Sequence, residues 1–596
     1  MKNLYKYCAV AALALTATSC ANFLEEEPKG KLVAENFFKS ANDLTMATNA
    51  LYNQVAVAQR NTNPYIIQLQ GDDITINTTT KEAYLSADAF VDPSDSKGAE
   101  DLWSGRYSVI QAANLIVDNA EKADASAEEI NIALGNALYW RATSYFDLVR
   151  VFGPLPVNLH NLPDGNQTPM TGVEEIYDMI IADLERANSL NLPAGYEDYK
   201  LGFTEKTNYW CTQQCVKATL AAVYMNRGGY PFYEAGNIGK EWYRKAADLL
   251  NEVYQGVQQG KYSLSLEQDY GQVYSYGNNW SNEQLMTISF FDNPGMMGEA
   301  GTVNPTSQFS KCQTTAFQDG WIDFMGEYRW WSKFPEGPRK NAVYEDVIYT
   351  KYKDSASNGI CCINWWATKN EQEVSASRDN ALLNIYHPTF ASLQVNADEA
   401  NNPLAAPYDS RKPVFTGQSV PQNHRYMRYS EVLCWFAEAT ARAEASEYLA
   451  DAKAALQAVM DRAYEAGKAP VAAGMSNADL AEQAWLEHGY EVTGYPLALV
   501  TRRADQFRLD RLKEAWEYRN GPQDDILVPA GTATTAYKVA GRLQYAEYTY
   551  QLSYDLKRAE DNQVAAQWRG YQSMYYPYPP KEIIKNPNIK RVSAMN

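Results

Sequence analysis

The stretch Ala137-Leu-Tyr-Trp-Arg-Ala-Thr-Ser-Tyr-Phe-Asp-Leu-Val-Arg-Val-Phe-Gly-Pro-Leu-Pro156 decides the fold. With the residues before it, this stretch places apolar side chains near helical spacing, which predicts one long helix over residues 129–152. Gly153 and Pro154 follow directly, and both residue types are typical of positions just past a helix C-terminus. The stretch therefore predicts a long helix that ends in a sharp turn.

Further helices are predicted after this one. Thr171 and Glu174 have capping-box spacing, which predicts a helix start, and two more helices are predicted over residues 211–226 and 241–254. Successive helices separated by Gly, Pro and Asn turns are typical of stacked helical hairpins of the tetratricopeptide kind. Helical patterns return over residues 428–444, 449–466 and 478–516. The predicted fold class is therefore mainly α.

The middle of the chain has a different texture. From about residue 261 to 419, Gly, Asn, Pro and Ser dominate and no long helical stripe occurs. A long segment of this kind usually forms functional loops on a rigid scaffold.

The chain has 596 residues, which allows three or four units or one large helical body with insertions. We expect the second arrangement, one continuous domain over residues 20–596. Its expected parts are the helical hairpins in 20–260, the loop-rich and Trp-rich face in 261–420, and C-terminal helices with a Tyr- and Pro-rich coil in 421–596.

Charge and composition narrow the function. The chain has 53 Lys and Arg against 72 Asp and Glu, a net charge of −19, which argues against a nucleic-acid binder. It has only four His, which leaves little material for metal or acid–base chemistry, but 43 Tyr and 14 Trp. This balance favours binding over catalysis.

The first residues have the pattern of an export signal. Lys2 and Lys6 precede an apolar run of ten residues, too short to span a bilayer as a helix. Small residues then lead to Cys20, so we expect residues 1–19 to be a lipoprotein signal peptide and Cys20 to carry lipid. The alternative is an ordinary secretory signal with an incidental cysteine. The acidic triplet at 25–27 resembles the signal that directs Bacteroidetes lipoproteins to the cell surface.

Outside the signal peptide and Cys20, six cysteines remain. Six cysteines in a chain of this length are too few for a disulfide scaffold. Cys211 and Cys215 have neither redox nor zinc spacing. The neighbours Cys361 and Cys362 could form a vicinal disulfide, although buried free thiols are the simpler expectation.

Catalytic and cofactor motifs do not occur. Nucleophile-elbow, zinc-protease, P-loop and dinucleotide-binding patterns are absent from the sequence. We therefore expect no enzyme activity and no cofactor. A structural calcium ion cannot be assigned, because the sequence has no EF-hand-like loop.

Several segments in one order resemble the SusD/RagB family, the surface nutrient-binding lipoproteins of Bacteroidetes. They comprise the opening stretch and the segments at 24–52, 71–73 (Gly-Asp-Asp), 103–114, 334–340 (Phe-Pro-Glu-Gly-Pro-Arg-Lys), 427–439 and 576–588, which ends in Asn-Pro-Asn. The segment around 482–519 departs from the family pattern, which puts the starch-binding branch, and so the sugar, in doubt.

The resemblance implies a SusD-like helical fold with four tetratricopeptide-like hairpins and an irregular, loop-rich half that presents a glycan site. It also implies a SusC-like TonB-dependent transporter as partner and a lipid-anchored position on the outer membrane, exposed at the cell surface. The expected function is capture of an oligo- or polysaccharide and its delivery to that transporter. Two alternatives stay open: a family member that binds peptides or glycoproteins, and a surface glycoside hydrolase, which needs only two suitably spaced carboxylates.

Stacking chemistry selects the candidate site residues. An aromatic plane covers the C–H face of a sugar while short polar side chains satisfy its hydroxyls. The best candidate is Trp321, since the resemblance matches its Gly-Trp pair to one that stacks on glycan in the starch-binding member. The other candidates are Trp280, Trp365, Trp366, Asn279, Asp319, Asp72 and Asp73. Core packing is the expectation for Trp103, Trp140, Trp210, Trp242, Trp435 and Trp516, and at least one of Trp330 and Trp331 is expected to be buried.

Overall fold

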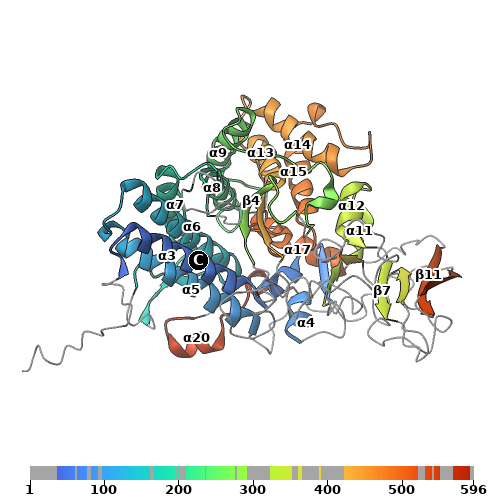
Figure 1. The fold of residues 1–596 in the computed structure, drawn as a ribbon, viewed down its shortest axis with the longest axis horizontal. Helices are drawn as coiled ribbons and strands as arrows, with labels where there is room; N and C mark the ends of the chain where they lie inside the picture. Colours follow the sequence, from blue (N-terminus) through green and yellow to red (C-terminus); the bar gives the residue numbers. More distant parts are fainter. Residues whose placement is uncertain are drawn as a thin grey trace, which may run out of the picture.

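The fold was obtained as a computed structural model (Figure 1). It describes residues 37–60, 63–76, 82–90, 97–161, 167–195, 199, 210–234, 236–275, 278–290, 323–345, 347–351, 360–364, 388–390, 422–520, 531–539, 542–550 and 568–590.

The long helix predicted from the opening stretch is α6, Ala127–Phe152. Ser126 caps its N-terminus: Ser126 Oγ accepts from the Glu129 N–H at 3.3 Å, and the Glu129 carboxylate accepts from the Ser126 N–H at 2.8 Å. The helix ends at Gly153, whose φ of 79° is a conformation that only glycine adopts readily. Nearly all side chains of its C-terminal two thirds are buried, so α6 lies in the centre of the core.

The other N-terminal helices pack in succession around α6 (Figure 1). α3 packs on α5, α5 on α6, α6 on α7, α7 on α8 and α8 on α9. Their bounds are α3 Ala41–Gln59, α5 Lys97–Asn119, α7 Val173–Ser189, α8 Gln213–Arg227 and α9 Lys240–Gln258. This succession confirms the predicted mainly α fold built from packed helix pairs.

One prediction for this part is wrong. Thr171 does not cap α7, because its backbone pairs with Leu155 in a short strand pair. The first helical residue is therefore Val173, with Gly172 at the N-cap and no side-chain cap.

The C-terminal helices join this array through α13, Tyr429–Ala443, which packs on α9. α14, Leu449–Ala463, and α15, Asn477–Glu491, both pack on α13. Two shorter helices follow, α16 Arg502–Arg508 and α17 Leu512–Asn520. The helical pattern predicted over 478–516 is thus three helices, since the chain turns after α15 at Gly494, with φ of 64°, and after α16 at Asp510, with φ of 58°.

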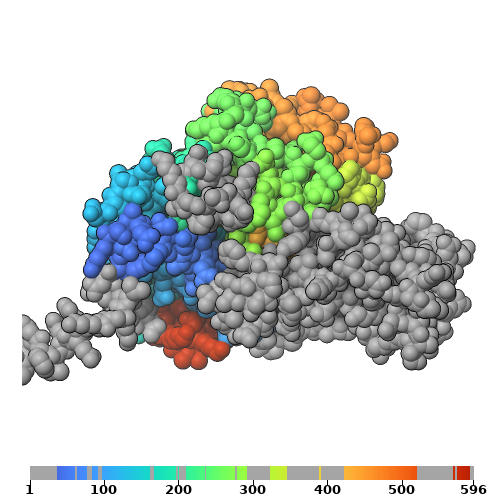
Figure 2. Space-filling view, viewed as in Figure 1, coloured from blue at the N-terminus to red at the C-terminus, as the bar shows by residue number. Residues whose placement is uncertain are grey.

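Short elements fill the spaces between these helices. They are η1 Asn63–Gln70, α4 Glu82–Asp88, η2 Ala120–Lys122, η5 Tyr270–Gln272, α11 Tyr328–Lys333, α12 Pro338–Val343, η10 Ala472–Gly474, α19 Tyr571–Met574 and α20 Pro580–Lys585. Figure 2 shows the N-terminal helices, the C-terminal helices and α20 adjoining on one face of the molecule.

The strands form small antiparallel sheets. The two-stranded pairs are β1 Ile74–Ile76 with β5 Phe324–Gly326, β2 Leu155–Pro156 with β3 Met170–Thr171, β4 Gln284–Ile288 with β10 His424–Arg428, and β6 Tyr344–Glu345 with β9 Thr389–Phe390. A four-stranded sheet has the order β12-β11-β8-β7, with β7 Val347–Lys351, β8 Ile360–Asn364, β11 Gly531–Val539 and β12 Arg542–Tyr550.

The β11–β12 hairpin corrects the expected coil in residues 421–596. Its two strands pair in register from Gly531 with Tyr550 to Val539 with Arg542. Both strands are rich in Thr and Tyr, and β-branched and aromatic side chains favour a pleated surface. These residue types indicate strands, although the Pro-rich end of the chain had led to the expectation of coil.

The tryptophan and cysteine predictions can be checked where side chains are described. Trp103, Trp140, Trp210 and Trp435 are buried, and Trp242 and Trp516 are half-buried against the core, as predicted. Of the adjacent pair, Trp330 is buried and Trp331 half-buried. Cys211, Cys215 and Cys434 are buried free thiols. Cys361 and Cys362 lie in β8, but their side chains fall outside the described residues.

Across the part of the chain that the structure describes, each helix is either too short or too polar to cross a bilayer.

Candidate ligand-binding face

The loop that carries Trp280 is held by a buried arginine. Arg425, in β10, is fully buried and its guanidinium donates to the carbonyls of Val273 at 3.2 Å, Ser275 at 2.7 Å and Asn423 at 2.9 Å. Two of these carbonyls, those of Val273 and Ser275, belong to the loop between η5 and β4, so one planar cation ties the start of that loop to β10. The residues that follow are therefore displayed from a rigid base.

Trp280 and Asn279 lie in this loop and are both half-buried. The Asn279 side-chain oxygen accepts from the Asn423 N–H at 3.3 Å, so its orientation is set by β10. The structure thus brings two of the predicted site residues together, next to each other and on a constrained turn.

The start of the segment that holds Asp319 and Trp321 is also fixed. Phe290 donates its N–H to Asn423 Oδ1 at 2.9 Å, and its ring lies 4.5 Å from that of His424. Burial, with Arg425 beside it, lowers the pKa of His424 to about 3, so this imidazole is neutral and packs as an aromatic ring. The Trp280 loop and the departure point of residues 291–322 therefore share one support, residues 423–425.

The other end of that segment enters β5. β5 pairs with β1 so that Phe324 lies opposite Ile76, and Gly326 opposite Ile74. Asp319, Trp321, Trp365 and Trp366 themselves lie outside the described residues, so their role as ligand contacts stays a prediction.

Asp72 and Asp73 stand at the opposite end of the β1–β5 pair and are engaged inside the protein. Arg502 donates to both carboxylate oxygens of Asp72, at 2.7 and 3.0 Å. The Arg502 guanidinium lies between two indole rings, 4.4 Å from that of Trp330 and 4.0 Å from that of Trp485. This fork-and-stack arrangement ties β1 to α16 and α15.

Asp73 has a different partner. Its carboxylate accepts from the Gly494 N–H at 2.8 Å, and burial raises the pKa of Asp73 to about 7. Both aspartates are less than a tenth exposed. The structure gives this Asp-Asp pair a packing role, and its predicted contact with a ligand stays untested.

A buried charge cluster includes Arg339 and Arg428, which belong to two of the segments that carried the family resemblance. Glu491, at the end of α15, faces three guanidiniums, those of Arg339 at 3.0 Å, Arg428 at 2.9 Å and Arg462 at 3.0 Å. Arg428 also contacts Glu283 at 2.9 Å, and Arg339 contacts Glu487 at 2.7 Å. We call these six residues the Glu491 cluster.

The electrostatics of the Glu491 cluster follow from its burial. Burial alone would raise the pKa of the Glu491 carboxyl, but Arg462, Arg428 and Arg339 together hold it well below its ordinary value. Glu283 lies just before β4, so this cluster links the base of the Trp280 loop to α12, α14 and α15. The Glu491 cluster was not predicted from the sequence, although Glu487 and Glu491 are four apart on one helix face.

A histidine between carboxylates stands beside this cluster. His488 Nδ1 contacts Asp505, its Nε2 lies 3.6 Å from Glu431, and all three side chains are buried. Burial disfavours the charged imidazole, but Asp505 outweighs it and raises the pKa of His488 to about 9. His488 is therefore a buried imidazolium that holds α15 to α16 and α13.

One further hollow is formed by described residues. A cavity of about 460 Å³ lies between the first turns of α3 and α6, with Tyr199 and Trp210 in its wall. No group of three or more His, Cys, Asp or Glu with metal-binding geometry occurs among the residues that the structure describes.

The chain is similar in sequence to known proteins. Residues 22–225 match a SusD-like family model described as "Starch-binding associating with outer membrane". Among curated proteins, a "SusD-like protein P2" of Formosa agariphila is 24% identical over 73% of this chain and 77% of its own length. A "SusD-like protein" of Bacteroides ovatus is 25% identical over 57% of this chain and 59% of its own length.

Solved structures have the same fold. A SusD homolog from Bacteroides thetaiotaomicron matches with a TM-score of 0.65 and 17% identity, covering 95% of this chain and 99% of its own. A structure described as containing xylogluco-oligosaccharide matches with a TM-score of 0.60 and 17% identity, over 91% and 97% of the two chains. A "Laminarin binding SusD-like protein" matches with a TM-score of 0.59 and 16% identity, over 92% and 98%.

Proposed function

Since this chain belongs to the SusD-like family of Bacteroidetes, we propose that it is a cell-surface lipoprotein that captures an oligo- or polysaccharide. In this proposal Cys20 carries the lipid that holds the protein to the outer membrane. The bound glycan is passed to a SusC-like TonB-dependent transporter, and the protein itself does not cleave it.

The observation that carries the proposal is the Trp280 loop in a chain of this family. A half-buried indole next to an amide, on a loop held by two Arg425 hydrogen bonds, suits a sugar ring, because stacking and hydroxyl recognition both need fixed partners. The proposed site consists of Trp280 and Asn279 with Trp321, Asp319, Trp365 and Trp366. It leaves out Asp72 and Asp73, whose carboxylates have protein partners.

Affinity gel electrophoresis against a panel of neutral polysaccharides tests this proposal. The mature chain should migrate more slowly in gels that contain xyloglucan, laminarin or another member of the panel. Trp321→Ala and Trp280→Ala should each weaken the retarding interaction by about tenfold or more, since a lost stacking platform removes its buried area and its ring contact.

Trp242→Ala is the matched control. Trp242 is half-buried on α9, where Lys245 and Arg227 cover its ring, so its loss should leave glycan binding unchanged. Retardation that survives both site substitutions would refute the site and leave the family membership intact. Binding of a peptide mixture with no glycan binding would refute the glycan proposal.

A further inference from the structure

The short helix α20 presents two isoleucines to solvent without a packing reason. Among the described residues, the exposed large apolar side chains are Met46, Leu159, Val471, Ile583 and Ile584. Ile584 is 82% exposed and Ile583 40%. None of the six side chains of α20 is buried, so the helix contributes nothing to the core.

Polar contacts on either side hold α20 in place. Tyr578 donates to the Pro154 carbonyl at 2.8 Å, Asn586 to the Thr168 carbonyl at 2.8 Å, and Asn588 to the Gln167 carbonyl at 2.9 Å. Lys581 contacts Glu100 at 2.7 Å. The helix is therefore fixed by its flanks while its isoleucines point away from the protein.

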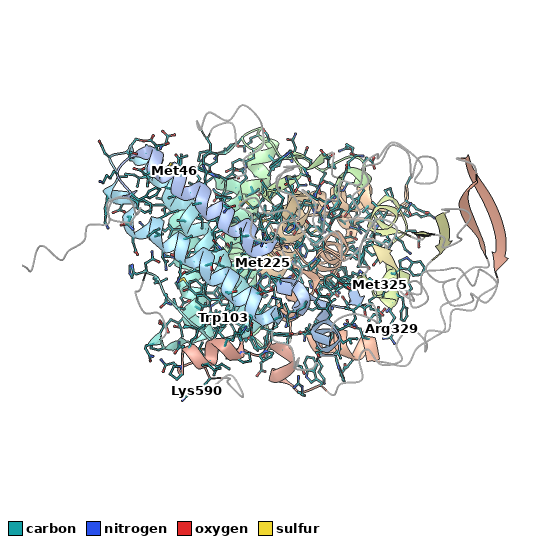
Figure 3. The ribbon with its side chains drawn as sticks, turned by 60° about the horizontal axis from the view of Figure 1, so that its bottom comes forward. Met46, Trp103, Met225, Met325, Arg329 and Lys590 are labelled. Carbon is teal, nitrogen blue, oxygen red and sulfur yellow. The ribbon has the colours of Figure 1, made fainter. Side chains whose placement is uncertain are left out.

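The charge around these side chains differs from that of the whole chain. Lys581 and Lys585 are well exposed and balanced by Glu100 and Glu582, while Lys590 is exposed with no acidic partner among the described residues. Figure 3 shows Lys590 beside α20 at the edge that comes forward in that view. On a protein of net charge −19, this region is locally neutral to positive.

We propose that the α20 face, made of Lys581, Ile583, Ile584, Lys585 and Lys590, rests on the lipid surface of the membrane. Isoleucines that enter the boundary between headgroups and acyl chains, flanked by lysines that reach phosphates, are the chemistry of an interfacial contact. Most of the acidic surface is repelled by anionic headgroups, whereas this face is not.

The proposal rests on the lipid anchor of the proposed function. The residues between Cys20 and Phe37 span at most about 60 Å, so an anchored Cys20 keeps the whole body within reach of the bilayer. An anchor alone leaves the orientation of the body on the bilayer free, and the α20 face limits that orientation.

Vesicle flotation tests the proposal with the mature chain carrying Cys20→Ala, which has no acyl chain. It should float with vesicles of phosphatidylcholine and phosphatidylglycerol at 3:1. The double variant Ile583→Ser, Ile584→Ser should lower the partition coefficient about tenfold. Lys590→Gln should lower it about fivefold on these vesicles, and not on pure phosphatidylcholine. Val471→Ser, at a 71% exposed apolar residue off this face, should change nothing.

Folding is checked by circular dichroism, which exposed side chains should leave unchanged. A Cys20→Ala protein that binds neither vesicle, or a double variant in that background that floats as well as its Cys20→Ala parent, overturns the proposal. So does a concentration-dependent dimer that the double variant abolishes without vesicle binding, because the face would then meet a second copy. Glycan retardation and palmitate labelling at Cys20, measured in parallel, show separately whether the proposed function itself has failed.

Discussion

Glu491→Gln is the sharpest test of how this fold supports its candidate face. The Glu491 carboxylate is fully buried and contacts Arg339, Arg428 and Arg462, each at about 3 Å. The substitution preserves shape but removes one charge, which leaves three buried guanidiniums with Glu283, Glu487 and the more distant Glu431. Breaking a buried ion pair from one side costs about 3–5 kcal/mol, so the free energy of unfolding should fall by that amount.

Glu482→Gln is the matched control, because it is the same substitution on the same helix. Glu482 pairs with Arg511 at 2.8 Å, but both side chains are 30–44% exposed. An exposed pair of this kind contributes no more than about 1 kcal/mol. Urea unfolding followed by tryptophan fluorescence gives both values, from the shift of the midpoint at constant slope.

The same variant has a functional readout. Glu283 lies just before β4 and shares its arginines with Glu491, so the base of the Trp280 loop should loosen when the cluster is broken. Glycan affinity should therefore fall in Glu491→Gln and stay unchanged in Glu482→Gln. A Glu491→Gln protein within about 0.5 kcal/mol of wild type, or no less stable than Glu482→Gln, would refute the reasoning.

Three further predictions follow from the charged contacts and the anchor. The pKa of His488 is raised in the folded state to about 9, so its stabilisation is complete below pH 6.5 and is lost as pH rises to about 9. The free energy of unfolding should fall by on the order of 3 kcal/mol across that window, and His488→Gln should flatten the profile in urea titrations. Arg502→Lys keeps the charge but loses the two-point contact with Asp72 and the stacking between Trp330 and Trp485. It should lower the free energy of unfolding by about 2–4 kcal/mol in the same assay, and a neutral result would show that the fork-and-stack arrangement is not needed. Cys20→Ala should abolish palmitate labelling and release the protein from washed membranes, and membrane retention at wild-type levels would contradict the proposed anchor.

The helices were predictable because their signals are local. The run that became α6 has a capping serine, an apolar interior and a terminal glycine, all within thirty residues. The start of α7 was misplaced because Thr171 pairs with Leu155, and a strand partner is invisible to a local pattern. The division of 478–516 into three helices likewise depends on turns whose need is set by packing.

The candidate site was only partly predictable, for a related reason. Trp280 and Asn279 were predicted from composition, because aromatic and amide residues in a Gly-rich loop suit sugars, and their contact with a ligand stays a prediction. The residues that position them, Arg425 and the Glu491 cluster, come from five separate segments that only the fold brings together. Asp72 and Asp73 looked like loop acids, but their arginine and amide partners lie more than 400 positions away.

Calorimetric titration of the mature chain with a polysaccharide from the panel tests the central claim most directly, because one trace reports both binding and turnover. A protein that binds glycan without cleaving it should give heat pulses that return to baseline and diminish to saturation. A baseline that stays displaced while glycan remains would show hydrolysis, and no heat from any glycan would show that sugars are not the ligand. Either result would contradict the account.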